Sequence, residues 1–120
     1  MIKSYKDLTV WQKAFELSLL VYRLTKNFPK EELYALISQI RRAAISIPSN
    51  IAEGYCRQRK LEYIQFLLIA FASGAELETQ LLIAKELRYV STENFETANR
   101  MLEEVMKMLN SLISKIKTSP

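Results

Sequence analysis

From Gln39 to Lys60 the chain reads QIRRAAISIPSNIAEGYCRQRK, and this stretch decides the fold. Apolar residues recur from just before this stretch into it at alternating spacings of four and three, which is the pattern of a helix that buries one stripe. They are Leu33, Ile37, Ile40, Ala44, Ile47 and Ile51. The pattern predicts a helix over about residues 31–53 whose apolar stripe faces a core.

Pro48 lies inside this periodic pattern, and the apolar stripe keeps its phase on both sides of it. A proline in a helix interior removes one backbone hydrogen bond, crowds the preceding turn and costs roughly 3 kcal/mol. We expect one long helix bent at Pro48, with Ser49 and Asn50 as polar support for the disturbed turn. The alternative is a break at which Pro48 opens a new helix, although Ile47 would make a poor N-cap. Gly54 is expected to end the helix.

The same stretch carries the net positive charge of the whole chain. Residues 41–60 hold five basic side chains against one acidic side chain, a net charge of +4, which equals that of all 120 residues. The five are Arg41, Arg42, Arg57, Arg59 and Lys60. The other hundred residues carry twelve basic and twelve acidic side chains, so their charges cancel.

The run QIRRAAISIPSNIAEG resembles the bacterial four-helix-bundle family encoded in intervening sequences of 23S ribosomal RNA genes. LTVWQKA upstream, FP before the second helix and ELETQL downstream extend the resemblance over roughly residues 5–116. The resemblance implies an up-down bundle that assembles into a ring, reported for this family as a homopentamer. A looser likeness to the accessory proteins of diversity-generating retroelements implies the same bundle and ring, which bind nucleic acid and a reverse transcriptase.

Length and composition predict one all-α domain spanning residues 1–120. A chain of 120 residues buries about two-thirds of its unfolded surface, and only two glycines and three prolines leave little room for loops. One cysteine, Cys56, cannot form an internal disulfide, which favours a reducing compartment. The N-terminal MIKSYKDL lacks the apolar core of a signal peptide. The longest apolar run, residues 66–72, is far shorter than the roughly twenty residues that span a bilayer. We therefore expect a cytoplasmic protein that does not enter a membrane.

Periodicity predicts three further helices, at about residues 8–26, 61–89 and 93–116. Four helices with short connections give an antiparallel up-down bundle. The first helix has two adjacent apolar lines, whereas a bundle core requires only one stripe. The second line consists of Leu8, Trp11, Phe15, Leu19 and Tyr22. This surplus favours a homo-oligomer in which the second line faces another subunit; the alternative is a wide core-facing side.

The inventory of catalytic residues is nearly empty. The chain has no histidine, which removes the usual general acid-base group near neutral pH and the Glu-x-x-His motifs of di-iron bundles. There is no glycine-rich phosphate loop, and one cysteine cannot make a zinc site. Cys56 beside Arg57 is most simply incidental, because no base accompanies it. We expect no enzyme activity, no metal and no cofactor.

The basic segment is the candidate binding surface, because the planar fork of arginine bridges phosphate oxygens and stacks on bases. We predict non-enzymatic binding to nucleic acid, as structured RNA or an RNA-containing complex, through phosphate contacts that need no sequence reading. In an oligomeric ring the repeated segments would form a continuous positive band. The candidate residues are Arg42, Arg57, Arg59, Lys60 and Tyr55, with Tyr63 as a second aromatic ring that could stack on unpaired bases.

The arginines have a second interpretation, in which they form ion pairs inside a structural scaffold or protein-interaction module. Arg41 lies next to the apolar stripe, so we expect it to pair with Glu76 or Glu78 of the third helix. Such a pair would fix the register of the helices more than it stabilises them. Glu53 is expected to pair with one of the arginines or to be solvated.

Overall fold

The computed structural model describes all 120 residues, and it contains four α-helices and no β-strand. The helices are α1 (Thr9–Thr25), α2 (Leu36–Tyr55), α3 (Lys60–Glu86) and α4 (Thr92–Thr118). Two short 3-10 turns, η1 (Tyr5–Asp7) and η2 (Lys30–Glu32), precede α1 and α2. The prediction of an all-α four-helix bundle is confirmed.

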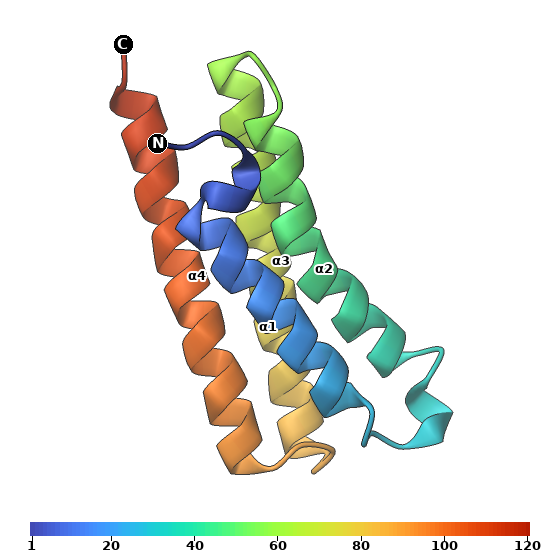
Figure 1. Cartoon of the computed structure of the whole chain (residues 1–120). Helices are drawn as coiled ribbons and strands as arrows, with labels where there is room; N and C mark the ends of the chain where they lie inside the picture. The colour runs from blue at the N-terminus through green and yellow to red at the C-terminus, as the bar shows by residue number, and fades with distance from the viewer.

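The four helices lie side by side along the 49 Å long axis of the molecule (Figure 1). Both α1 and α3 pack against α2 and α4, and they lie diagonally opposite each other across the core. Figure 1 places both termini and the α2–α3 connection at one end of the bundle, which we call the terminal end. The α1–α2 and α3–α4 connections lie at the other end, which we call the far end.

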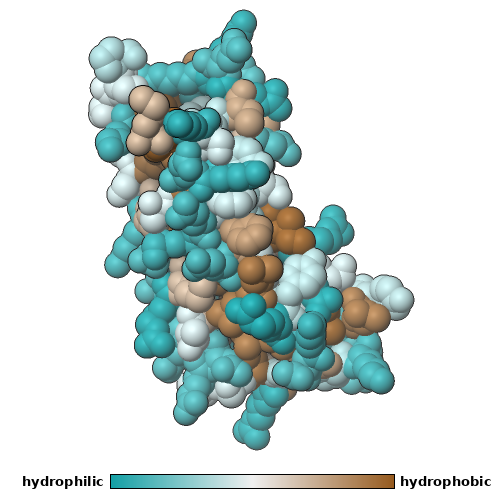
Figure 2. Space-filling view, in the orientation of Figure 1, coloured by the Kyte–Doolittle hydropathy of each residue, from teal (hydrophilic) through white to brown (hydrophobic).

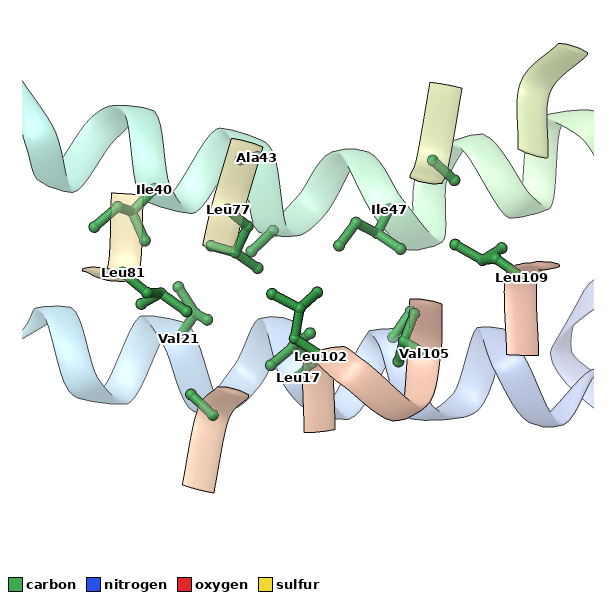
Figure 3. Close-up of a cluster of buried hydrophobic side chains, with 14 of the residues drawn as sticks. Leu17, Val21, Ile40, Ala43, Ile47, Leu77, Leu81, Leu102, Val105 and Leu109 are labelled. Atoms are coloured by element: carbon green, nitrogen blue, oxygen red, sulfur yellow. The ribbon is translucent and has the colours of Figure 1, made fainter. Parts of the chain in front are cut away.

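The core contains side chains from all four helices, and Figure 3 shows how they meet between the ribbons. Its fully buried members include Leu17, Val21, Ile40, Ile47, Leu77, Leu81, Leu102, Val105 and Leu109. The predicted stripe of α2 is confirmed from Ile37 to Ile51. Leu33 is an exception, since it precedes α2 and is 44% exposed.

The helix α2 begins at Leu36, later than the sequence predicts, because the acidic residues before it form the 3-10 turn η2. Glu32 holds this turn in place: one carboxylate oxygen accepts from the Tyr89 hydroxyl at 2.9 Å, and the other accepts from the backbone N–H of Leu36 at 3.4 Å. A partner from the α3–α4 connection therefore decides where α2 starts.

The helix α2 continues through Pro48 without interruption, so the alternative of a break there is wrong. Pro48 has no N–H for the carbonyl of Ala44, and Ser18 of α1 lies in the right place to replace it. The Ser18 hydroxyl lies 3.0 Å from the Ala44 carbonyl and 3.0 Å from the carbonyl of Ala14 in its own helix, so its single proton is shared between these two acceptors. Asn50 supports the same turn by donating to the carbonyl of Ser46 at 2.7 Å. The bend of the helix stays a prediction.

Gly54 does not end α2, contrary to the sequence-based prediction, because α2 extends to Tyr55 and Gly54 is a buried helical residue. A Cβ atom at this position would lie 2.8 Å from the Cβ of Phe66 and 3.1 Å from Cδ1 of Tyr63. The glycine therefore allows α2 and α3 to approach each other closely at the terminal end.

The helix α3 is long and apolar enough to cross a membrane by length and composition alone, with a mean hydropathy of 1.5 over its most apolar 18-residue window. Core helices of soluble proteins meet the same criterion, and 39% of this window is buried within the bundle. Length and hydropathy therefore do not by themselves assign α3 to a membrane.

Candidate nucleic-acid interface

The terminal end brings together three parts of the chain that are distant in sequence (Figure 1). Residues 1–8, 53–62 and 112–120 together hold seven basic and three acidic residues. The basic residues are Lys3, Lys6, Arg57, Arg59, Lys60, Lys115 and Lys117, and the acidic residues are Asp7, Glu53 and Glu62. The rest of the chain holds ten of each sign, so the net charge of +4 belongs to this surface, which we call the basic end.

Specific contacts hold the segments of the basic end in place. Lys60 at the start of α3 donates a hydrogen bond to the carbonyl of Ser119, which follows α4. The Asp7 carboxylate accepts from the backbone N–H of Lys3 at 2.8 Å, which fixes the N-terminal segment. Tyr5 then packs edge-on against Trp11, with 5.4 Å between ring centroids. The three segments are therefore ordered parts of one surface.

Arg57 and Arg59 of the α2–α3 connection and Lys60, the first residue of α3, are exposed. The Arg57 guanidinium lies 4.8 Å from the centroid of the Phe66 ring, so its position is partly fixed by an aromatic contact. The Nε of Arg59 lies 3.8 Å from a carboxylate oxygen of Glu62, and the Arg59 side chain is 83% exposed. Exposed ion pairs contribute little to stability, so this guanidinium is available to a phosphate group.

Tyr55 and Tyr63 contact each other rather than presenting free rings. Their ring centroids lie 6.1 Å apart in a T-shaped arrangement, and both residues are half-buried. Burial raises the pKa of Tyr63 to about 12, with a smaller contribution from the neighbouring Tyr55. The two rings are therefore partly covered by each other and by the bundle.

Arg42 is not part of the basic end. It lies thirteen residues before Tyr55, the last residue of α2, so about 20 Å of helix separates it from the α2–α3 connection. Its side chain is exposed and forms no ion pair. Ser49 is also exposed on α2 and, unlike Asn50, makes no side-chain hydrogen bond at the disturbed turn.

Arg41 does connect two helices, but its partners differ from those predicted. It faces α1, where its Nε donates to the Thr25 hydroxyl at 2.8 Å and its guanidinium lies 4.6 Å from the centroid of the Tyr22 ring. It forms no ion pair with Glu76 or Glu78, because both glutamates belong to α3 on the other side of α2. Arg41 therefore fastens α2 to the end of α1 through uncharged groups.

The structure has two ion pairs, Lys13–Glu104 at 3.1 Å and the longer Arg59–Glu62 pair. Glu53 is exposed and belongs to neither, so it is a solvated helix residue. Cys56 is an exposed free thiol, and no group of three or more potential ligand side chains is arranged to hold a metal ion.

Comparison with protein families gives a match over residues 6–111 to the model of the 23S rRNA-intervening sequence protein. The chain belongs to this family. A similar solved structure is the crystal structure of a protein of unknown function from the S23 ribosomal protein family of Bacteroides thetaiotaomicron. It superposes with a TM-score of 0.80 at 28% sequence identity, over 88% of this chain and 98% of that chain. None of the curated proteins matches the chain significantly.

Sequence reasoning missed four residues of the basic end: Lys3, Lys6, Lys115 and Lys117. A count along the chain hides them, because acidic residues elsewhere cancel their charge. The predicted number of helices could have revealed these residues. In an up-down bundle with an even number of helices, the last helix ends at the same end of the bundle where the first helix begins.

Proposed function

We propose that this protein is a non-enzymatic, oligomeric protein whose basic end binds nucleic acid, as structured RNA or a ribosome-associated complex. One observation carries the proposal: three separate segments meet at one end of the bundle, and together they hold the whole net charge of +4. Lysine and arginine side chains that neutralise phosphates release counterions, so such a surface needs no sequence-specific contact to bind.

Two further observations favour RNA as the ligand. The matching family is named after intervening sequences of 23S rRNA and the similar crystal structure after the S23 ribosomal protein family, which associates the family with ribosomal RNA without naming a ligand. The tyrosines at the basic end contact each other, which favours an ordered phosphate backbone over splayed single-stranded bases. The single free cysteine favours a reducing compartment, and we propose that the protein meets this ligand in the cytoplasm.

Self-association would strengthen this function. Phe15 and Leu19 of α1 are 45% and 47% exposed, and they belong to the second apolar line that predicts an oligomer. Each added copy would repeat the basic end, so several weak phosphate surfaces would act together. The pentamer implied by the family resemblance is one such assembly.

A second function, that of a protein-interaction scaffold, is favoured by the exposed apolar side chains of α3. Leu61 is 79% exposed and Leu68 is 47% exposed, and large exposed apolar patches mark protein contacts. In that function the partner would be another protein, such as the reverse transcriptase implied by the looser likeness, and the basic end would have no ligand.

A pair of charge-reversal variants separates the two functions. The first replaces Arg57, Arg59 and Lys60 at the basic end by glutamate, and the control replaces Lys26, Lys30 and Arg100, which are exposed and lie away from it. Both variants change the net charge by the same amount. We expect at least tenfold weaker RNA binding for the first and little change for the control. Equal binding by both variants would contradict the assignment of the basic end.

A further inference from the structure

An open groove of about 910 Å³ lies between the start of α1 and the second half of α4, and we call it the α4 groove. Leu8 and Val10 line it from one side, and residues between Lys107 and Thr118 line it from α4. Figure 1 shows the N-terminal segment beside this half of α4. Figure 2 shows hydrophobic atoms gathered in the middle of the molecule, whereas the surface over α4 is mostly hydrophilic. The groove therefore continues the basic end along the side of the bundle.

The charge of α4 reverses along its length. Up to Glu104 the helix holds four acidic side chains and one basic side chain, whereas residues 105–118 hold three lysines and no acidic side chain. The Lys13–Glu104 ion pair at 3.1 Å joins α1 to α4 at this boundary. Lys107 and Lys115 line the groove, and none of its lining residues is acidic. A polyanion at the basic end can therefore continue along the groove as far as Lys107, beyond which the acidic half of α4 repels it.

Small polar side chains lie along the groove between and beside these lysines. Lys107, Ser111, Ser114 and Thr118 follow one another at spacings of four, three and four, so they share one face of α4, and Asn110 lies beside them. Asn110, Ser111 and Ser114 are exposed, and their side chains make no hydrogen bond within the chain. Their amide and hydroxyl groups can therefore both donate to and accept from a ligand.

This set of groups fits the sugar–phosphate backbone of RNA. Lysines contact phosphate oxygens, and hydroxyl and amide side chains contact phosphate and sugar. The ribose 2′-hydroxyl, which DNA lacks, both donates and accepts hydrogen bonds. No aromatic side chain lines the groove, so none stacks there on an unpaired base. About 16 Å of helix separates Lys107 from Thr118, which is long enough for several nucleotides of one strand.

We infer that the α4 groove binds the backbone of one strand of the RNA that the basic end holds, and that Asn110, Ser111 and Ser114 contact its ribose 2′-hydroxyl groups. Lys107 and Lys115 contact the flanking phosphates. This inference rests on the proposed function and specifies how the protein distinguishes RNA from DNA. The basic end attracts either nucleic acid by charge, and the groove adds contacts that only RNA can make. Backbone contacts carry no sequence information, so the preference is for RNA as a polymer.

A neutral variant tests the 2′-hydroxyl contacts. Asn110→Ala, Ser111→Ala and Ser114→Ala together remove the polar groups without changing the net charge, and alanine suits exposed helix positions, so the helical spectrum should stay native. Binding is measured with an RNA hairpin and a DNA hairpin of the same sequence at one salt concentration. We expect the triple variant to bind the RNA about fivefold or more weakly, because hydrogen bonds are lost, and to bind the DNA within about twofold of the wild type.

Two comparisons control for position and charge. Gln39→Ala with Thr79→Ala and Thr97→Ala removes three exposed polar side chains that lie outside the groove, and this variant should bind both hairpins as the wild type does. Lys107→Ala should weaken RNA and DNA binding alike and reduce the salt slope by about one, because it removes a phosphate contact. Lys26→Ala, an exposed lysine at the far end, should change neither.

A modified RNA tests the same contacts on the wild-type protein. An RNA hairpin methylated on its 2′ oxygens keeps its phosphates but loses the 2′ hydrogen-bond donors. We expect it to bind about as weakly as the DNA hairpin. Binding equal to that of the unmodified RNA would overturn the assignment of the 2′-hydroxyl contacts.

The possible failures are distinct. A triple variant that binds RNA like the wild type, or that loses RNA and DNA binding equally, would overturn the inference. A wild type that binds both hairpins equally would overturn it as well. In each of these cases, weaker binding after charge reversal at Arg57, Arg59 and Lys60 would still support the basic end. A wild type that binds neither hairpin at low salt would overturn both the inference and the proposed function.

Discussion

One hydroxyl group compensates for the proline inside α2. Pro48 deprives the Ala44 carbonyl of its usual backbone donor, and Ser18 supplies a replacement from the neighbouring helix at 3.0 Å. Ser18 is 8% exposed, so water has little access to this carbonyl if the hydroxyl is removed. A residue distant in sequence therefore allows a proline to remain inside a continuous helix.

We expect Ser18→Ala to lower the free energy of unfolding by about 1–2 kcal/mol, because it leaves a buried carbonyl without a donor. In a Pro48→Ala background the same change should cost less, since the new backbone N–H can pair with the Ala44 carbonyl. Urea unfolding of the four variants measures this coupling. An equal cost of Ser18→Ala in both backgrounds would show that the hydroxyl does not compensate for Pro48.

Tyr63 gives the fold a dependence on alkaline pH. Burial and Tyr55 raise the pKa of Tyr63 from 10.0 to about 12, so the folded state favours the neutral phenol. This contribution to stability is complete below pH 10 and is lost as the pH rises from 10 to about 12. Subtracting the absorbance of the Tyr63→Phe variant from that of the wild type isolates the Tyr63 phenolate. Its titration midpoint should lie near pH 12 in the folded protein and near pH 10 in urea. The same midpoint in both conditions would contradict the burial of this hydroxyl.

At the scale of the helix, the sequence predicts the core positions, which periodic burial determines. It does not predict a helix end that depends on a single contact. Ile40 and Ile47 are at their predicted core positions because burial imposes helical spacing on apolar residues. The start of α2 was predicted too early, because Leu33 continues the spacing while the Glu32–Tyr89 hydrogen bond holds the preceding segment in a different turn.

The two glycines illustrate a further limit and yield a prediction. Gly54→Ala should lower the melting temperature, because the new Cβ meets the Cβ of Phe66 at 2.8 Å and the backbone oxygen of Tyr63 at 3.2 Å. These atoms cannot move separately from α3, and overpacking of this kind costs about 1–3 kcal/mol. Gly74→Ala meets only the flexible side chain of Met106 and gains about 1 kcal/mol of helix propensity. Equal melting temperatures for the two variants would contradict this distinction.

At the scale of the whole molecule, the candidate site was predictable only where its residues are close in sequence. Arg57, Arg59 and Lys60 were found by counting charges in one segment, and they are exposed at the basic end. Lys115 and Lys117 join them only because the fold returns α4 to the terminal end. Arg42 was assigned to the same surface because it is close in sequence. A helix rises by a fixed distance per residue, so the thirteen residues between Arg42 and the end of α2 place it about 20 Å away.

The two proposals support each other at this scale. A single bundle offers seven basic side chains over one narrow end, which is a modest surface for nucleic acid. The α4 groove would extend this surface along the side of the bundle, with Lys107 as a further basic contact. Self-association would repeat both surfaces, and simultaneous contacts raise the overall affinity without any new contact type. The basic end would then hold the ligand by charge, while the groove selects RNA.

The most direct test of the central claim is the anisotropy of a labelled structured RNA titrated with the wild-type protein at several salt concentrations, with DNA of equal length for comparison. If four or more basic side chains contact phosphates, the logarithm of the binding constant should fall with the logarithm of salt concentration with a slope of about −4. We predict micromolar or tighter binding with this steep slope, and tighter binding to RNA than to DNA. Absence of binding even at low salt would contradict the account of the basic end.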